Sequence, residues 1–298
     1  GAIHIARAFH DAGLPAGVLN LVFGVPADIS SYLIPNDIIR LVAFTGSTAI
    51  GRHLTTMASD HMTSVLMELG GHAPVIVCED TDVKAAAVSG ASRKMRNAGQ
   101  VCTSPTRFFV HDQIFDEFLQ HFTDRAAATV VGNGMEPGVE MGPLANDRRI
   151  TALSEFVDDA RTKGADLLTG GSRINAKGYF FEPTVLANVP DNARVMQEEP
   201  FGPLAIVNPV GSLDEAIERA NSVPYGLAAY AFTNRSDYAN QMVERVEAGN
   251  LSINTLEASL PETPFGGVKS SGYGREGGTE GLHHYMVVKT VSHSYTIV

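Results

Sequence analysis

Apolar residues recur at helical spacing in some stretches of the chain and form short continuous runs in others. The helical spacing predicts helices at residues 2–12, 82–97, 115–129, 148–163, 212–221 and 237–247, and from residue 49 onward. The short apolar runs predict strands at residues 18–23, 39–44, 65–68, 74–78, 107–110, 180–186, 204–210, 228–232 and 251–254. Because helices and strands alternate, the pattern predicts an α/β fold with largely parallel sheets.

Two segments near the C-terminal end do not follow this alternation. Residues 266–281 contain seven glycines and predict a loop. Residues 285–298 are rich in β-branched side chains and are too apolar for a free tail. Because an unpaired strand edge invites pairing with another chain, this last segment predicts a strand that contacts a second subunit.

Composition narrows the class of protein. The chain has 298 residues, of which 44% are hydrophobic and 18% charged, so it can bury a core in one or two domains and is not disordered. No apolar run approaches the length of a membrane span. The net charge of −11 disfavours nucleic-acid binding. The two cysteines exclude a disulfide framework and fit a reducing compartment, so we expect a cytoplasmic protein.

The two cysteines have different neighbours. Cys102 is flanked by the small residues Gly99, Thr103 and Ser104, which leave room for a substrate beside the sulfur. A thiol attacks carbonyl groups well when its surroundings favour the thiolate, so Cys102 is a candidate nucleophile. The alternative is a buried, inert cysteine. For Cys78, which ends an apolar run, the inert interpretation is clearly favoured.

Two further features suggest a site. Glu68 ends an apolar strand and precedes two glycines, so burial would raise its pKa toward that of a general base, although a surface carboxylate is the alternative. Residues 44–51 predict a strand, a tight turn and a helix start. Backbone amides at a helix N-terminus favour a phosphate. The turn matches neither the Walker A spacing nor G-x-G-x-x-G, so alone it is a weak signal.

Taken in order, these segments resemble the NAD(P)-dependent aldehyde dehydrogenase superfamily. The resemblance is carried by Phe-Thr-Gly-Ser at 44–47, Glu-Leu-Gly-Gly at 68–71, Gly-Gln-Val-Cys at 99–102 and Glu-Pro-Phe-Gly-Pro at 199–203. Further similar segments lie at residues 13–20, 141–144, 182–184, 224–227, 264–267 and 271–276. Because so many segments occur in the same order over essentially the whole chain, a chance match is negligible.

The resemblance implies a mechanism. Cys102 would add to the aldehyde as a thiohemiacetal and carry the thioester left after hydride transfer. Glu68 would activate the water that hydrolyses this thioester and could help to deprotonate Cys102. The backbone N–H of Cys102 is one candidate donor to the oxyanion. NAD is the expected cofactor, and NADP is not excluded.

The resemblance also implies cofactor contacts. Glu199 would bind the nicotinamide ribose hydroxyls, and Phe201 would pack beside that ribose. Glu198 is equally acidic, and only the Glu-x-Phe spacing favours Glu199. The remaining predicted contacts lie near the nicotinamide (Leu69 and Gly70) and near the pyrophosphate (Gly46 and Ser47).

Other residues would determine substrate choice. By resemblance, the aldehyde tunnel would be walled by residues 256–260 together with Val101, Thr103 and Phe265. Arg107 and Arg275 could bind a substrate carboxylate, although structural ion pairs are the favoured interpretation for both. His72 stands where the family most often has lysine, and we expect it to tune the surroundings of Glu68.

The resemblance implies a partial Rossmann-type cofactor domain and an α/β catalytic domain. We assign residues 1–70 to the second part of the dinucleotide-binding domain, 71–270 to the catalytic domain and 271–298 to a C-terminal segment with an oligomerisation strand. Family members begin with a longer N-terminal portion that holds a second oxyanion donor. We therefore expect this chain to be the C-terminal part of such an enzyme, with little or no turnover by itself. A homodimer or homotetramer is expected.

Two alternatives to aldehyde oxidation remain open. An acyl-CoA-forming relative is one, but such relatives often lack the residue matched by Glu68. A catalytically inactive structural or binding member is the other, although it would be free to lose Cys102 and Glu68, and both are present.

Overall fold

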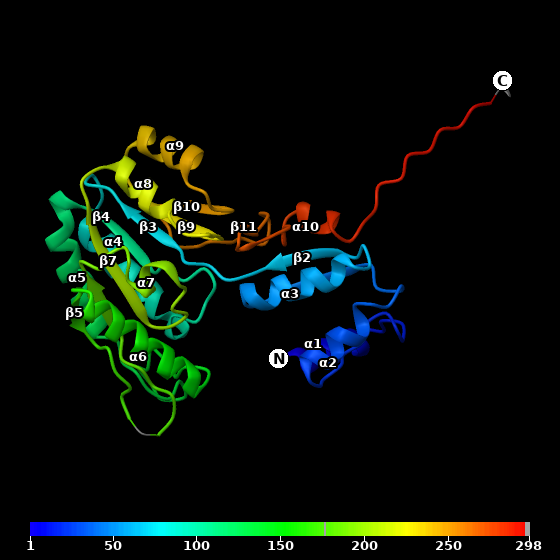
Figure 1. The fold of residues 1–298 in the computed structure, drawn as a ribbon, viewed down its shortest axis with the longest axis horizontal. Helices are drawn as coiled ribbons and strands as arrows, with labels where there is room; N and C mark the ends of the chain where they lie inside the picture. The colour runs from blue at the N-terminus through cyan, green and yellow to red at the C-terminus, as the bar shows by residue number, and fades with distance from the viewer. Residues whose placement is uncertain (176, 296–298) are drawn as a thin grey trace.

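The computed structural model describes residues 1–175 and 177–295 and shows a mixed α/β fold, as the pattern predicts (Figure 1). Its α-helices are α1 (Ala2–Asp11), α2 (Pro26–Leu33), α3 (Thr48–Ser59), α4 (Val83–Met95), α5 (Phe115–Ala127), α6 (Asp147–Thr162), α7 (Arg194–Gln197), α8 (Leu213–Asn221), α9 (Ser236–Arg245) and α10 (Glu280–His283). In Figure 1 most of these helices surround a large sheet, whereas α1, α2 and α3 lie apart from it.

The large sheet holds the main core. It has seven strands in the order β10 (Asn250–Ile253), β9 (Ala228–Phe232), β3 (Pro74–Val77), β4 (Arg107–His111), β7 (Leu204–Val210), β6 (Thr184–Ala187) and β5 (Asp166–Thr169). Neighbouring strands are parallel except β5, which is antiparallel to β6. Continuous apolar strands of this kind belong to a sheet covered on both faces.

A smaller, three-stranded sheet is separate from the large one. Its order is β1 (Leu41–Thr45), β2 (Ser64–Glu68) and β12 (Gly272–Tyr273), with β1 and β2 parallel. A third, two-stranded sheet pairs β8 (Tyr225–Gly226) with β11 (Val268–Lys269). Since β2 ends at Glu68 and β3 begins at Pro74, residues 69–73 join the two larger sheets (Figure 1).

Helix α4 leads directly toward Cys102. The Asp82 carboxylate caps its start by accepting a hydrogen bond from the Ala85 amide, at 3.0 Å. Small side chains cover its buried face, and a Cβ at Gly90 would lie 2.9 Å from the Phe108 ring. The helix therefore packs closely on the large sheet. This packing fixes the position of its C-terminal end, and so of the residues that lead to Cys102.

Most predicted elements are confirmed, and strands β7 and β9 have the predicted bounds. The strand predicted at residues 18–23 is wrong: Val18, Val22 and Phe23 are exposed, and no neighbouring strand in the described part of the chain offers them a ladder. Sequence patterns also missed α2, β5 and the short strands inside residues 266–281.

The predicted C-terminal strand is absent from residues 285–295, which extend away from the rest of the molecule (Figure 1). A strand needs a neighbouring edge, and within the described residues none lies beside this segment. Its pairing with another subunit stays a prediction, and residues 296–298 lie outside the described residues.

Candidate active site

Cys102 lies in a turn with an unusual backbone, which we call the Cys102 turn (residues 97–106). Helix α4 ends in a 3₁₀ turn (Arg96–Gly99) in which Asn97 and Ala98 have φ of 53° and Gly99 has φ of 66°. Such left-handed values are disfavoured for residues that carry a Cβ. The half-buried Cys102 side chain follows at once, so this strained stretch sets its position.

Hydrogen bonds to distant parts of the chain hold this turn. The Gln100 amide oxygen accepts a hydrogen bond from the Ala145 amide at 2.8 Å, and the Gln100 amide nitrogen donates to the Asn97 carbonyl at 3.2 Å. The buried Tyr230 hydroxyl donates to the Thr103 carbonyl at 2.7 Å. The residues on both sides of Cys102 are therefore fixed from outside the turn.

The electrostatics of Cys102 favour the neutral thiol. Burial raises its pKa, and the negative charges of Glu199 and Glu68 raise it further. The backbone amides of Cys102 and Thr103 oppose this rise, because they donate hydrogen bonds to the sulfur. The thiol therefore needs a nearby base to become a nucleophile at neutral pH.

Glu68 is a buried carboxylate at the end of β2. Only 4% of the residue is exposed, and within the described part of the chain neither carboxylate oxygen has a hydrogen-bond partner. Burial raises its pKa to about 7, with a further rise from Glu276 and an opposing effect of Arg275. A carboxylate that titrates near neutrality suits a general base.

Glu199, and not Glu198, lies against the two glycines that follow Glu68. One carboxylate oxygen of Glu199 accepts a hydrogen bond from the Gly71 amide at 3.3 Å, and the other would lie 2.6 Å from a Cβ at Gly70. Glu198 is exposed and pairs with Arg194 at 3.0 Å. Burial raises the pKa of Glu199 to about 7, and this carboxylate borders the same short segment as Glu68.

Gly71 connects these groups to the Cys102 turn. A Cβ at Gly71 would lie 2.6 Å from the carbonyl oxygen of Cys102, so only glycine allows this approach. The Gly71 amide also donates to Glu199. Glu68, Cys102 and Glu199 are distant in the sequence, and the structure brings them together around residues 70–71.

The turn before α3 lies next to Glu68. The Gly46 amide donates to the Glu68 carbonyl at 3.0 Å, and the Ser47 hydroxyl accepts from the Ile50 amide at 3.5 Å. The Leu69 side chain packs against Gly51 of α3 so closely that a Cβ there would overlap it. The N-terminus of α3 therefore opens beside the segment that carries Glu68.

The remaining predicted contact residues are more scattered. Phe201 has φ of 41° and is 36% exposed, so its ring is open to solvent. Val101 is half-buried and Thr103 is buried in the Cys102 turn. Half-buried Phe265 exchanges two backbone hydrogen bonds of 2.7 Å with Glu276, one of the residues that act on Glu68.

A hollow of about 470 Å³ lies between the end of α4 and the predicted substrate loop. Arg93 and Arg96 line it on one side, and Leu256 and Glu257 line it on the other. Arg93 pairs with Glu257 at 3.3 Å. Arg96 is exposed and forms no ion pair with any described residue, so the hollow carries positive charge close to the start of the Cys102 turn.

The ion-pair interpretation of Arg107 and Arg275 is wrong. Arg107 is 1% exposed and donates to the carbonyls of His72, Arg219 and Ala220 at 3.0–3.1 Å. Arg275 donates to the carbonyls of Gly267 and Gly274. Within the described residues neither lies in an ion pair, and the recorded acceptors of both guanidinium groups are backbone carbonyls.

His72 connects the Glu68 segment to the Glu199 segment. It is 2% exposed, and one ring nitrogen lies 2.9 Å from the Val195 carbonyl in α7. Burial holds its pKa well below the usual value, so the neutral ring donates to that carbonyl. His72 therefore joins the glycine pair to the helix that precedes Glu199.

Sequence patterns missed several residues that act on this site. Lys94 is fully buried, and burial lowers its pKa to about 7. The charges of Lys94 and Arg149 act on Glu199, and Arg149 donates to the Pro200 carbonyl. Helical spacing could have found Lys94, because it continues the buried face of Ala87, Gly90 and Ala91.

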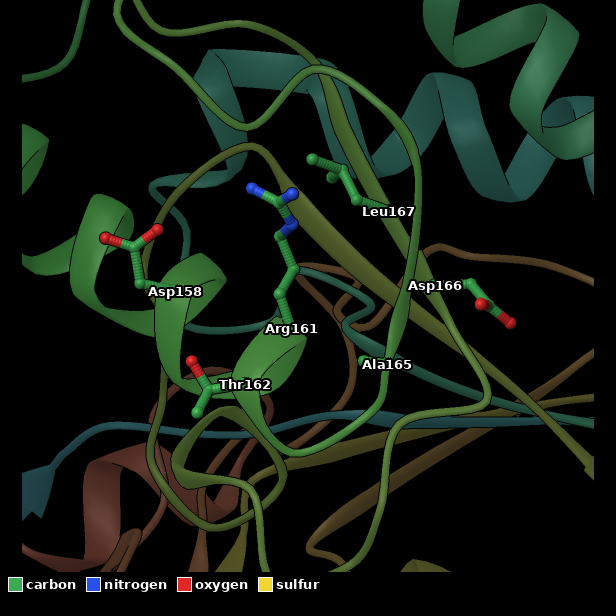
Figure 2. A pocket seen from close by; sticks show the side chains of 6 residues that line it. All are labelled: Asp158, Arg161, Thr162, Ala165, Asp166 and Leu167. Carbon is green, nitrogen blue, oxygen red and sulfur yellow. The ribbon is translucent and has the colours of Figure 1, made fainter.

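Other hollows lie apart from this site. One of about 670 Å³ between α6 and β5 shares no residue with it; its lining consists of Asp158, Arg161, Thr162, Ala165, Asp166 and Leu167 (Figure 2). No cluster of potential metal ligands occurs among the described residues. In the same part of the chain, none of the helices has the length and apolarity needed to cross a membrane.

The fold and this site define an α/β protein in which a cysteine and two carboxylates converge between two sheets. The chain belongs to the aldehyde dehydrogenase family, whose model matches residues 1–291.

Individual relatives agree with this assignment. The chain is 46% identical over 276 residues to a putative 4-(hydroxymethyl)benzenesulfonate dehydrogenase of Comamonas testosteroni, covering 93% of this chain and 57% of that protein. It is 42% identical to a probable NADP⁺ succinate-semialdehyde dehydrogenase of Sinorhizobium fredii, with the same coverage. A solved succinate-semialdehyde dehydrogenase of Burkholderia pseudomallei matches with a TM-score of 0.94 and 40% identity, over 97% of this chain and 60% of that chain. The chain thus spans somewhat over half the length of these relatives.

Proposed function

We propose that the polypeptide carrying this sequence oxidises an aldehyde to a carboxylic acid with NAD(P)⁺. One observation carries the proposal: Gly71 touches the backbone of Cys102, donates to Glu199 and follows Glu68 by three residues. A nucleophile, a base and a half-buried acceptor for hydroxyl groups are thereby gathered around one short segment.

The residues present fit a dinucleotide. Glu199 is a half-buried carboxylate beside the glycine pair and can accept hydrogen bonds from ribose hydroxyls, while the exposed ring of Phe201 can pack beside the ribose. Gly46 and Ser47 open the N-terminus of α3, whose amides suit a pyrophosphate, and Leu69 and Gly70 lie between these two regions. When bound, NAD(P)⁺ supplies the hydride acceptor. NAD is the default, and NADP is not excluded.

In the proposed reaction, the Cys102 thiolate forms a bond to the aldehyde carbon. The backbone amides of Cys102 and Thr103, which lie beside the sulfur, are candidates to stabilise the oxyanion. After oxidation the acyl group remains on Cys102 as a thioester. Glu68 then takes a proton from water, whose oxygen attacks the thioester carbon, and Cys102 leaves as the thiolate. The raised pKa of Glu68 supports this role at neutral pH.

We further propose an aldehyde with an acidic group as the substrate. The named relatives act on compounds that carry a sulfonate or a carboxylate, such as 4-(hydroxymethyl)benzenesulfonate and succinate semialdehyde. Arg93 and Arg96 line the hollow at the start of the Cys102 turn and would attract such a group.

An activity panel on the full-length polypeptide that carries this sequence tests both proposals. Succinic semialdehyde and 4-formylbenzenesulfonate are compared with butanal and benzaldehyde, each with NAD⁺ and NADP⁺. We expect kcat/KM for the acidic substrates to be at least about tenfold higher, and Arg96→Ala to remove most of that difference. Absence of turnover with every aldehyde would contradict the oxidation, and equal rates would contradict the acidic substrate.

Labelling with iodoacetamide addresses the inactive alternative. We expect Cys102 to react selectively over Cys78 and to change its rate when NAD⁺ is added. Equal labelling of the two thiols, or no labelling, would favour a structural member. Adding coenzyme A to the assay tests the acyl-CoA alternative: free acid as the product supports the water reaction proposed for Glu68.

The assembly, the location and the domain division stay proposals. The apolar side chains of Val287, Val288 and Val291 are exposed, which supports pairing of residues 285–298 in a homodimer or homotetramer. Light scattering of Val288→Asp would test this pairing, since a smaller mass than that of the unchanged chain is expected. A cytoplasmic location rests on the two unpaired cysteines, and the domains 1–70, 71–270 and 271–298 rest on the family resemblance.

A further inference from the structure

Lys94 is a buried amine that the proposed reaction does not use. Its side chain lies in the last turn of α4 with no exposed surface. Within the described residues no carboxylate forms an ion pair with it, although the negative charge of Glu199 raises its pKa slightly against the effect of burial. Since a buried amine loses its hydration, an apolar residue would fold more easily at this position. The buried lysine therefore suggests a role beyond packing.

The contacts of Lys94 point to the Cys102 turn. Its amino group donates to the Ser104 hydroxyl at 3.2 Å and to the Thr106 hydroxyl at 3.0 Å. The Thr106 hydroxyl in turn donates to the Ser104 carbonyl at 3.0 Å. The Ser104 amide closes the turn around Cys102 by donating to the Val101 carbonyl at 2.9 Å. One side chain thus fixes two residues that follow Cys102 at close range.

The turn needs such an anchor because its first half is strained. Asn97 and Ala98 hold left-handed backbone angles, which persist only where the surroundings fix both ends. Gln100 fixes the first end through Ala145. Lys94 fixes the second end through Ser104 and Thr106. The strained backbone between these two ends can relax only if one of the two sets of hydrogen bonds breaks.

We propose that Lys94 is a positioning residue that, through Ser104 and Thr106, holds the Cys102 sulfur and backbone amide in place for attack on a carbonyl. This inference rests on the proposed function only in treating Cys102 as the nucleophile. It does not depend on which aldehyde is oxidised.

The test compares Lys94→Met with Lys84→Met in the complete polypeptide. Lys84 is an exposed lysine at the start of the same helix and serves as the matched control. Peptide mass spectrometry gives the rate of iodoacetamide labelling at Cys102 relative to Cys78, and steady-state kinetics give kcat and KM. We expect Lys94→Met to lower Cys102 labelling and kcat by at least about tenfold, with KM changed far less. Lys84→Met should leave all three unchanged.

Variants of the acceptors keep the lysine in place. Thr106→Val removes one acceptor and should lower Cys102 labelling in the same direction, whereas Thr106→Ser keeps the hydroxyl and should restore it. If Lys94→Met does not fold, this pair decides the question by itself. A folded Lys94→Met or Thr106→Val protein with unchanged Cys102 labelling and kcat would overturn the inference.

Failure of the inference can be told from failure of the proposed function. If the unchanged polypeptide oxidises no aldehyde but the variants still slow Cys102 labelling, the positioning role stands and the function fails. If aldehydes are oxidised and the variants behave as the unchanged chain, the function stands and the positioning role is overturned.

Discussion

Cys78 is buried and Cys102 is half-buried, and burial raises the pKa of both thiols, but the backbone around them differs. Cys78 follows β3 in the large sheet, where its amide donates to the Phe232 carbonyl at 3.0 Å. Burial raises its pKa to about 12, with Asp80 and Glu79 acting in the same direction. Cys102 follows a left-handed backbone stretch and lies beside residues 70–71.

This comparison shows that burial alone does not identify a reactive thiol. Both cysteines would be dismissed on pKa, because each favours the neutral form. The difference lies in the neighbours: Cys102 has Glu68, whose pKa is about 7, within electrostatic reach and backbone amides that oppose the rise in its own pKa. Carboxylates act on both thiols, but of the two only Cys102 lies in a turn with left-handed backbone angles beside the glycine pair.

Replacing each cysteine by serine should give the largest difference between the two regions. We expect Cys102→Ser to lower kcat by at least about 10³-fold, because the hydroxyl is a far weaker nucleophile. Cys78→Ser should keep kcat within about threefold and act mainly on stability, since its site is apolar core. Steady-state kinetics and thermal unfolding measure both. Comparable losses of kcat in the two variants would erase the distinction.

Adding a methyl group at Gly99 tests the strain in the Cys102 turn. A Cβ there would overlap the carbonyl oxygen of Gly202, and φ is 66°. We expect Gly99→Ala to destabilise the fold by about 1–3 kcal/mol or more and to slow Cys102 labelling.

Gly134 serves as the control for that substitution. A Cβ at this position would meet open space, so Gly134→Ala should change the free energy of unfolding by less than about 0.5 kcal/mol. Denaturant titration gives both values. Equal stability of the two variants would mean that the turn carries no strain.

The pH dependence of stability tests the burial of Glu68. Its pKa is about 7 in the fold against 4.5 ordinarily, so the folded state keeps a proton that the unfolded chain releases. The associated stability is complete below pH 4.5 and is lost as pH rises through about 7. Glu68→Gln lacks this loss, so its Tm should rise relative to the unchanged chain between about pH 5 and 8, by roughly 2–4 °C for each kcal/mol. A difference in Tm that is independent of pH would contradict the burial.

The smallest effect is expected at the Arg93–Glu257 pair, which borders the hollow. Glu257 is largely exposed, so Glu257→Gln should cost less than about 1 kcal/mol of stability. Glu257→Gln should also lower KM for an acidic aldehyde, because without the Glu257 carboxylate Arg93 can pair with the acidic group of the substrate. An increase in KM would argue that this hollow is not on the substrate path.

The sequence predicted the fold class and most helices and strands, because apolar periodicity reports which face is buried. The sequence also indicated Cys102, Glu68 and Glu199 as site residues, since ordered motifs can be recognised without knowledge of the fold. Their roles in catalysis and cofactor binding stay predictions. The sequence could not place Arg149 at the site, because its contact with the Pro200 carbonyl joins residues far apart in the chain. Helical spacing reports that Lys94 is buried, but not that its charge acts on Glu199.

The errors have physical causes as well. Residues 18–23 are apolar enough for a strand, but strand formation depends on a neighbouring ladder that composition does not report. For Arg107 and Arg275, charge suggested carboxylate partners, whereas the fold offers backbone carbonyls that no sequence pattern indicates.

The most direct test of the central claim is the mass of the enzyme caught in mid-reaction. The Glu68→Gln polypeptide is mixed with NAD(P)⁺ and the best aldehyde of the panel, quenched with acid and analysed by peptide mass spectrometry. The account predicts an acyl adduct on Cys102 whose mass is that of the aldehyde less two hydrogens, accumulating because water is no longer activated. No adduct, or an adduct on Cys78, would contradict it.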